Sequence, residues 1–234
     1  MPIRQTLPKA FAPCILEVER KFRSLAVRQL TQHGGVPPFR SLQALRPQTI
    51  RDTYYNDKAG LLTSAGVWVR RRNGAWEAKV RKGGDFTNSQ FEELREVGDI
   101  AACVERITGQ GVVRAGEQVG ERGQKENFGL VTMADFVTTR ETWIADDEFW
   151  IVRDRMDFGH EVGEVELQKT LEGKKVGEAP SEEEKRAEMQ RMDERITEFM
   201  KRYEWAFAEG KPVGKLTAYF KMMGRTPSGS SEAR

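Results

Sequence analysis

Apolar and polar residues alternate along residues 15–22, which read ILEVERKF. Glu17, Glu19 and Lys21 occupy one parity, and mainly apolar residues occupy the other. In a β-strand, this alternation directs the charged side chains to one face and the apolar side chains to the opposite face. The simplest interpretation is a sheet with one face in solvent and one packed face. The segment predicts a two-faced strand and leaves open which face points inward.

The same alternation recurs on both sides of Asn73-Gly74, a residue pair that favours a two-residue hairpin turn. A hairpin closed by these two residues pairs Trp68 with Lys79. Its polar face then carries Trp68, Arg70, Arg72, Glu77, Lys79 and Arg81. The opposite face is apolar, interrupted only by Arg71. The hairpin is therefore predicted to separate charged and apolar side chains as sharply as the first strand does.

Further elements follow from the same periodicities. We predict strands over residues 48–55, 91–97, 134–144, 149–154 and 162–168. We expect loops over residues 56–64 and, in a Gly-rich segment, over 109–129. Six or seven strands in sequence, some with hairpin-length connections, indicate a largely antiparallel sheet or a closed barrel.

Helices are predicted in four places. The first covers residues 24–33, with Ser24 as its N-cap, and the second covers 99–108. Ser181 and Glu184 form a capping-box pattern that starts a third helix. Apolar residues at helical spacing in that helix are expected to pack on the sheet, namely Met189, Met192, Ile196, Phe199 and Tyr203. A short fourth helix is expected over 215–223.

Composition narrows the class of protein. Charged residues form 32% of the 234-residue chain but cancel to a net charge of +2, which does not predict binding to nucleic acid or membranes. Its 12 Phe, 5 Trp and 4 Tyr indicate a packed fold. Cys14 and Cys103 fit no metal-site spacing, and no apolar run reaches the roughly 18 residues of a membrane span. We expect a cytoplasmic monomer, and the N-terminal segment is either a transit peptide or a ragged terminus.

Charged faces recur on several of the predicted strands. Glu164 and Glu166 repeat the pattern of the first strand, and Glu93 and Arg140 lie on further strands. Either these faces point to water, or the strands close into a barrel with the charges inside. Burial of unpaired ions costs on the order of several kcal/mol each, so a charged interior is sensible only around a charged ligand. Triphosphate with a divalent metal would need both signs of charge.

Seven segments occur in an order that resembles the CYTH family, the triphosphate tunnel metalloenzymes, and most closely the eukaryotic thiamine triphosphatases. These segments are EVERK at 17–21, RDTYY at 51–55, WVRRR at 68–72, WEAK at 76–79, FVTTR at 136–140, DFGHEVGEVEL at 157–167 and GKL at 214–216. The resemblance divides the chain into an N-terminal extension at 1–14, a tunnel domain at 15–223 and a tail at 224–234. It implies an α+β fold with a closed, antiparallel, eight-stranded barrel, a charged interior and flanking helices.

The resemblance also implies roles for individual residues. Carboxylates expected near Mg²⁺, or alternatively Mn²⁺, are Glu17, Glu19, Glu93, Asp154, Glu164 and Glu166. Cations expected to hold phosphate are Lys21, Arg70, Arg72, Lys79, Arg140 and Lys215. Lys21, with a lowered pKa, and the glutamates, Glu19 among them, are candidates to activate water. Relatives tend to have two alternating aspartates before DFG, whereas this chain has Val152 and Asp154, unless a one-residue gap realigns them.

The implied reaction is metal-assisted hydrolysis of the terminal phosphoanhydride. Trp68, on the face of Arg70 and Arg72, would suit stacking on an organic ring, which makes thiamine triphosphate the expected substrate. Trp68 alternatively plugs one end of the tunnel. Inorganic triphosphatase or adenylate cyclase activity, a non-catalytic phosphate-binding module and a structural sheet with solvated charges are the competing hypotheses.

Overall fold

A computed structural model of the chain describes residues 13–109, 127–172 and 179–224. Nine strands form one antiparallel sheet, in the order β2-β7-β3-β4-β5-β6-β1-β9-β8. An additional pairing of β7 with β8 closes eight of them into a barrel, and β2 pairs with β7 outside this ring. The predicted eight-stranded antiparallel barrel is confirmed.

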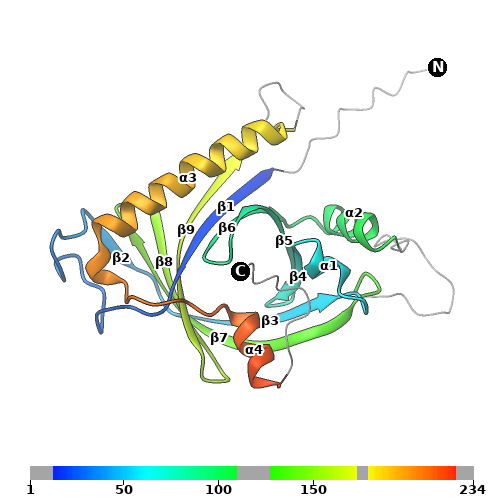
Figure 1. The fold of residues 1–234 in the computed structure, drawn as a ribbon, viewed down its shortest axis with the longest axis horizontal. Helices are drawn as coiled ribbons and strands as arrows, with labels where there is room; N and C mark the ends of the chain where they lie inside the picture. The colour runs from blue at the N-terminus through cyan, green and yellow to red at the C-terminus, as the bar shows by residue number, and fades with distance from the viewer. Residues whose placement is uncertain (1–12, 110–126, 173–178, 225–234) are drawn as a thin grey trace, which may run out of the picture.

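The strands have the following bounds: β1 Cys14–Phe22, β2 Leu42–Ala44, β3 Gln48–Asn56, β4 Val67–Arg72, β5 Ala75–Gly84, β6 Asn88–Leu94, β7 Val131–Ala145, β8 Phe149–Met156 and β9 Glu161–Leu171. The helices are α1 Leu61–Ser64, α2 Val97–Thr108, α3 Glu182–Arg202 and α4 Lys215–Met222, with one 3-10 turn, Glu204–Ala206. Figure 1 shows α3 lying along the outside of β1 and β9, and α4 at one opening of the ring, near β3 and β7.

The apolar faces of the strands point outward, beneath the helices. Leu16, Val18 and Val165 pack in one cluster with residues of α3. All five predicted core residues of that helix are buried there, namely Met189, Met192, Ile196, Phe199 and Tyr203. A second cluster packs β4 and β5 against α1 and α2. Because side chains alternate between the faces of a strand, Glu17, Glu19 and Lys21 of β1 and Glu164 and Glu166 of β9 lie inside the barrel.

The predicted hairpin register is confirmed. Trp68 pairs with Lys79, and Arg70 pairs with Glu77. Asn73 and Gly74 both have positive φ, as the tight turn requires. The capping box at Ser181 and Glu184 also forms, with reciprocal hydrogen bonds at the start of α3.

The predicted helix over residues 24–33 is wrong. The backbone of this segment instead pairs with the chain after α3: Ala26 N–H donates to Ala206 O and Ala208 N–H donates to Ser24 O, both at 2.9 Å. Leu25 and Phe207 form the β-bridge between the two segments. Contact with a segment about 180 residues away along the chain has overridden the local capping signal.

Other boundaries differ by a few residues. Strand β6 begins and ends three residues earlier than predicted, because Arg20 of β1 pairs with Asn88 and Glu96 already serves as the N-cap of α2. The predicted loop over 56–64 contains α1, and β2 was not predicted. The predicted extension at 1–14, the loop at 109–129 and the tail at 224–234 lie largely outside the described residues.

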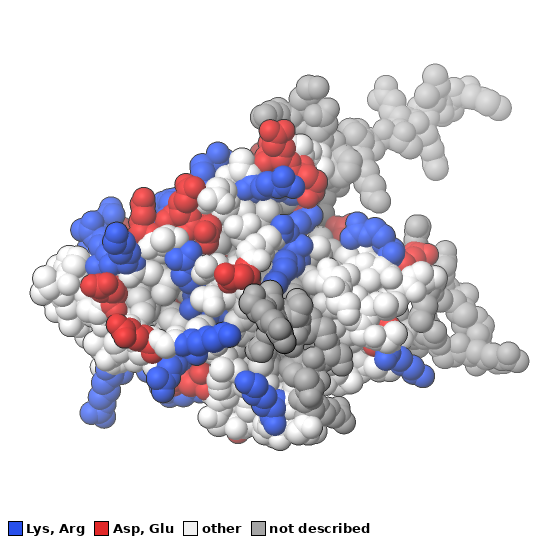
Figure 2. All heavy atoms as spheres, in the orientation of Figure 1, with Lys and Arg blue, Asp and Glu red and all other residues white. Residues whose placement is uncertain are grey.

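The surface carries both signs of charge. On the face shown in Figure 2, Lys and Arg side chains are interspersed with those of Asp and Glu. No helix within the described ranges is long and apolar enough to cross a membrane. Cys14 and Cys103 are both free and buried.

Candidate functional site in the charged barrel interior

Three carboxylates converge inside the barrel. Glu17 and Glu19 come from β1, and the register places Glu166 of β9 directly opposite Glu19. Oxygen atoms of the three groups lie within 4.8 Å of one another, and all three residues are buried. Glu17 Oε2 receives no hydrogen bond of normal geometry, although it forms an ion pair with Lys79. An all-oxygen donor set of three buried carboxylates fits a hard divalent cation such as Mg²⁺.

Lysines neutralise part of this carboxylate cluster. Lys79 Nζ lies 2.5 Å from Glu17 Oε2 and 3.2 Å from Glu19 Oε2, and Lys21 also forms an ion pair with Glu19. Although burial acts to raise the pKa of Glu19, the two lysines lower it well below its usual value. Burial dominates at Glu17 and raises its pKa, against the effect of Lys79.

Glu166 differs from both of its neighbours. Burial, together with the charge of Glu164, raises the pKa of Glu166 to about 7, against the opposing effect of Arg140. The cluster therefore combines a carboxylate of lowered pKa at Glu19 with two carboxyl groups, Glu17 and Glu166, that bind a proton more tightly than usual. A divalent cation would favour the ionised form of all three.

Asp154 lies with cations rather than in this cluster. Arg140 donates two hydrogen bonds to it, at 2.8 and 2.7 Å, and Lys215 forms a further ion pair. Burial acts to raise the pKa of Asp154, but Lys215 and Arg140 lower it well below its usual value. Lys215 is the first residue of α4, so the C-terminal helix supplies a charge to the barrel interior.

Two more predicted metal ligands have cationic neighbours. Glu164 is paired with Lys21 in the β1–β9 register, and its carboxylate lies 3.7 Å from Lys21 Nζ. Glu93 accepts a hydrogen bond from Arg95 at 2.9 Å and lies 3.9 Å from Lys79. Burial acts to raise the pKa of Glu93, but Lys79 and hydrogen bonds lower it to about 2. Of the six predicted carboxylates, the structure therefore brings only Glu17, Glu19 and Glu166 together.

Arg70 and Arg72 project from β4 toward β3. Arg72 donates two hydrogen bonds to Asp52, both at 2.8 Å. Arg70 donates to Glu77 and, at 3.2 Å, to Tyr54 Oη, and lies 3.9 Å from Asp52. Asp52 is fully buried, and our sequence reasoning missed it. The signal was available in the RDTYY segment, because Asp52 and Tyr54 share the parity that pairs with Arg72 and Arg70.

Val152 occupies an inward-facing position. It pairs with Thr142 on one side and with Glu164 on the other, and is almost completely buried. The register of β8 is continuous on both sides and places Val152 and Asp154 on the same inward face. The neighbour of Glu164 on β8 is therefore a valine and not a carboxylate.

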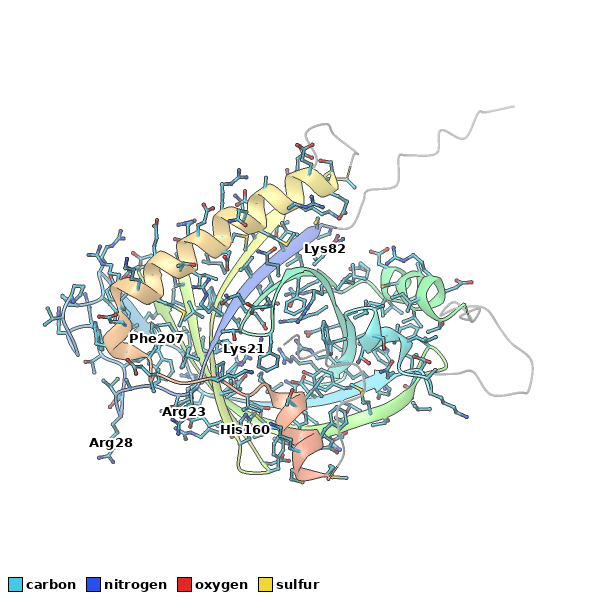
Figure 3. The ribbon with its side chains drawn as sticks, viewed as in Figure 1. Lys21, Arg23, Arg28, Lys82, His160 and Phe207 are labelled. Carbon is cyan, nitrogen blue, oxygen red and sulfur yellow. The ribbon has the colours of Figure 1, made fainter. Side chains whose placement is uncertain are left out.

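Aromatic side chains line another part of the interior. Phe136 of β7 lies 5.7 Å from Tyr54, 5.6 Å from Phe158 and 5.6 Å from Tyr219 of α4, measured between ring centroids. His160, in the turn between β8 and β9, lies beside α4 (Figure 3) and its Nε2 is 2.7 Å from Val213 O. Trp68 packs on the edge of this group and meets Phe91 edge-on at 5.6 Å.

A cavity of about 690 Å³ lies outside the barrel, where β2 joins β7. Arg28, Arg153 and Arg155 line it, and Figure 3 shows Arg28 pointing away from the barrel. Arg153 and Arg155 both bind Glu141. Among the described residues, the cluster of carboxylates that could hold a metal lies in the barrel and not at this cavity, so the barrel interior remains the candidate site.

Comparison with known proteins agrees with this architecture. Among solved structures, a protein from Hippeastrum, provisionally assigned as an adenylyl cyclase and described as having a dominant triphosphatase activity, shares 14% identity with a TM-score of 0.50. The match covers 92% of this chain and 99% of the other. A protein from Pyrococcus horikoshii shares 15% identity with a TM-score of 0.48, covering 89% of this chain and 99% of the other. A provisionally assigned adenylate cyclase from Vibrio parahaemolyticus shares 14%, with a TM-score of 0.46 and coverages of 87% and 98%.

At 14% identity, the Hippeastrum structure indicates a shared fold only. No curated protein matches the chain. The family model of the CYTH domain matches residues 16–196, which is well over half of the sequence and includes every strand of the barrel except the first residues of β1. The chain belongs to the CYTH domain family.

Proposed function

We propose that this protein hydrolyses the terminal phosphoanhydride of an organic triphosphate, releasing phosphate, and that thiamine triphosphate is its substrate. The observation that carries the proposal is the carboxylate cluster of Glu17, Glu19 and Glu166, surrounded by lysines and arginines in the interior of a closed barrel. Cations alone would suit any anion. The added carboxylates favour a ligand that arrives with a divalent metal.

Glu17, Glu19 and Glu166 would hold the metal, which we propose to be Mg²⁺ with Mn²⁺ as a substitute. When bound, the metal would offset negative charge on the phosphates and on the phosphoryl group being transferred. Glu164, Glu93 and Asp154 would support the site indirectly, by holding the cations that they contact in place until phosphate oxygens replace them.

The six cations would exchange their present carboxylate partners for phosphate oxygens. Arginine suits this exchange because its guanidinium can donate two parallel hydrogen bonds to phosphate. The full set is Lys21, Arg70, Arg72, Lys79, Arg140 and Lys215. Each of these six has a carboxylate partner among the described residues, so their charges are compensated in the unliganded interior.

Lys21 and Glu19 would position the attacking water. Burial acts to lower the pKa of Lys21, but Glu19 and Glu164 raise it above its usual value, contrary to the lowered value that a lysine base would require. Lys21 therefore suits a proton-donating contact, either to phosphate or to water. Glu19, which is held ionised, suits acceptance of a hydrogen bond from the water.

Trp68 supports an organic substrate, because its ring lies beside Lys79 at the edge of the charged region and adjoins the aromatic group around Phe136. Thiamine has a pyrimidine and a thiazolium ring that stack favourably on aromatic faces. The triphosphatase activity attributed to the Hippeastrum protein is consistent with this reaction class. Inorganic triphosphate is the second candidate, because Arg81 already lies 5.4 Å from the Trp68 ring and adds positive charge there.

A substrate panel tests the proposal. Purified protein is incubated with thiamine triphosphate, inorganic tripolyphosphate or ATP, with Mg²⁺ or with EDTA, and phosphate release is followed. We expect the fastest release from thiamine triphosphate and none in EDTA. Faster release from tripolyphosphate would select the second candidate. Metal-independent binding without release from any substrate would indicate a phosphate-binding module and refute the enzymatic proposal.

A further inference from the structure

Arg81 lies inside the barrel at the end of a line of cations. It pairs with Phe91 of β6, and Phe91 in turn pairs with Glu17 of β1. Residues directly opposite each other in antiparallel strands share a face, so Arg81 faces inward with Glu17. Arg81 also follows Lys79 by two residues on β5, which extends the line of cations on the β4–β5 hairpin by one step, roughly 7 Å.

Arg81 differs from the other inward-facing cations in its lack of an acidic partner. Each of the six cations considered above contacts at least one carboxylate. Within the described ranges, Arg81 forms no ion pair, and its buried Nε atom has no hydrogen-bond partner. A half-buried guanidinium without a counter-ion is unfavourable in the unliganded protein. The barrel interior therefore retains one uncompensated positive charge next to Trp68.

Aromatic contacts hold Arg81 in this position. Its Cζ atom lies 5.4 Å from the centroid of the Trp68 ring, and Trp68 meets Phe91 edge-on. Gly66 adjoins the aliphatic part of Arg81, because a Cβ atom at Gly66 would lie 3.1 Å from Arg81 Cβ. The indole face can hold the cation while its N–H groups remain free to donate.

We propose that Arg81 is a further substrate-binding residue, which donates hydrogen bonds to the phosphate of the substrate that lies nearest to Trp68. This inference rests on the proposed function, since it requires a triphosphate in the barrel. Arg81 would recognise the phosphate and not the organic ring of the substrate. Arg81 should therefore contribute equally to the binding of inorganic and organic triphosphates.

Arg71 provides a matched control. It is also a half-buried arginine on the same hairpin, its Cζ lies 4.8 Å from the Trp76 ring, and its Nε also has no hydrogen-bond partner. However, Arg71 pairs with Trp76 and lies on the outer face of the barrel, where solvent can compensate its charge. The two arginines therefore differ chiefly in the side of the barrel that they face.

The test compares Arg81→Met with Arg71→Met, because methionine retains much of the aliphatic volume and removes the charge. Dissociation constants are measured by calorimetry in EDTA, with inorganic tripolyphosphate and with thiamine triphosphate as probes. We expect Arg81→Met to weaken the binding of both probes by about 10- to 100-fold, as for the loss of one charge-assisted contact, and Arg71→Met to leave both unchanged. The melting temperature of unliganded Arg81→Met should equal or exceed that of the parent, because an uncompensated charge has been removed.

Three results would overturn the inference. Unchanged binding in Arg81→Met, with a parent protein that binds both probes, refutes the role of Arg81 and leaves the proposed function intact. Weaker binding accompanied by a lower melting temperature of the unliganded variant assigns Arg81 a structural role. Failure of the parent protein to bind or hydrolyse either probe with or without Mg²⁺ refutes the proposed function, and the inference with it.

Discussion

Two walls of the same barrel interior bury side chains of opposite character, charged on one wall and aromatic on the other. The charged wall, on β1, β5 and β9, buries Glu17, Glu19 and Glu166 among lysines and an arginine. The aromatic wall, on β3 and β7, buries Tyr54 and Phe136 beneath α4. Both walls are inward faces of strands in one continuous sheet.

The difference shows which wall is complete without a ligand. Aromatic rings pack against one another without needing a polar partner, and their burial stabilises the fold directly. The charged wall instead brings three carboxyl groups together, and the pKa values of two of them, Glu17 and Glu19, are displaced in opposite directions. The aromatic wall should therefore govern stability, and the charged wall should govern activity.

The largest expected effect is on catalysis, from Glu19→Gln. This change removes a buried carboxylate from the proposed metal site but retains its shape, so kcat with Mg²⁺ and thiamine triphosphate should fall about 10³-fold. The matched control is Glu141→Gln, on the outer face of β7, which should retain the parent activity. Equal turnover in the two folded variants would show that the charged wall is not the active site.

The aromatic wall should respond through stability. Phe136→Ala removes a ring that contacts Tyr54, Phe158 and Tyr219, and should lower the free energy of unfolding by about 3–5 kcal/mol. The comparison is Trp150→Ala, whose larger side chain is 42% exposed and should cost less than about 1 kcal/mol. Denaturant unfolding measures both. Similar losses in the two variants would contradict the assignment of Phe136 to a packed wall.

A smaller effect should appear in the pH dependence of stability. Glu166 has a pKa of about 7 in the folded protein and an ordinary value of 4.5. The folded state therefore binds this proton more tightly, so the stabilisation is fully present below pH 4.5 and is lost as the pH rises to about 7. Unfolding of the metal-free protein and of Glu166→Gln is compared between pH 4.5 and 8. The variant should gain up to about 3 kcal/mol relative to the parent over this range, whereas parallel curves would contradict the shift.

Much of the fold could be predicted because the relevant signals are local. Alternation in residues 15–22 defined the two faces of β1, and Asn73-Gly74 defined the register of the β4–β5 hairpin. The error over residues 24–33 has the opposite cause. Backbone groups of that segment form hydrogen bonds with residues near Phe207, and no local sequence pattern indicates such a distant partner.

For the site, the sequence predicted which residues share a face of a strand but not which of them are in contact. Parity placed Glu17 with Glu19 on one face and Lys79 on the polar face of its hairpin, and the family resemblance implied that these faces and Asp154 point into the barrel. Neither could show that Asp154 lies with Arg140 and Lys215, because neighbours across a barrel depend on its closure and on the placement of α4. Asp52 and Arg81 also occupy inward-facing positions of their strands, but the position of a residue along a strand does not show whether its charge is paired.

The position of β1 has a consequence for synthesis of the protein. This first strand lies between β6 and β9, so one of its edges has no partner until residues 161–171 have left the ribosome. Lys215 follows later still, at the start of α4. The nascent chain therefore exposes the four charged residues of β1, Glu17, Glu19, Arg20 and Lys21, to water for most of its translation. These charges should protect the unpaired strand from aggregation during translation, because charged side chains on an open strand edge discourage pairing with other chains.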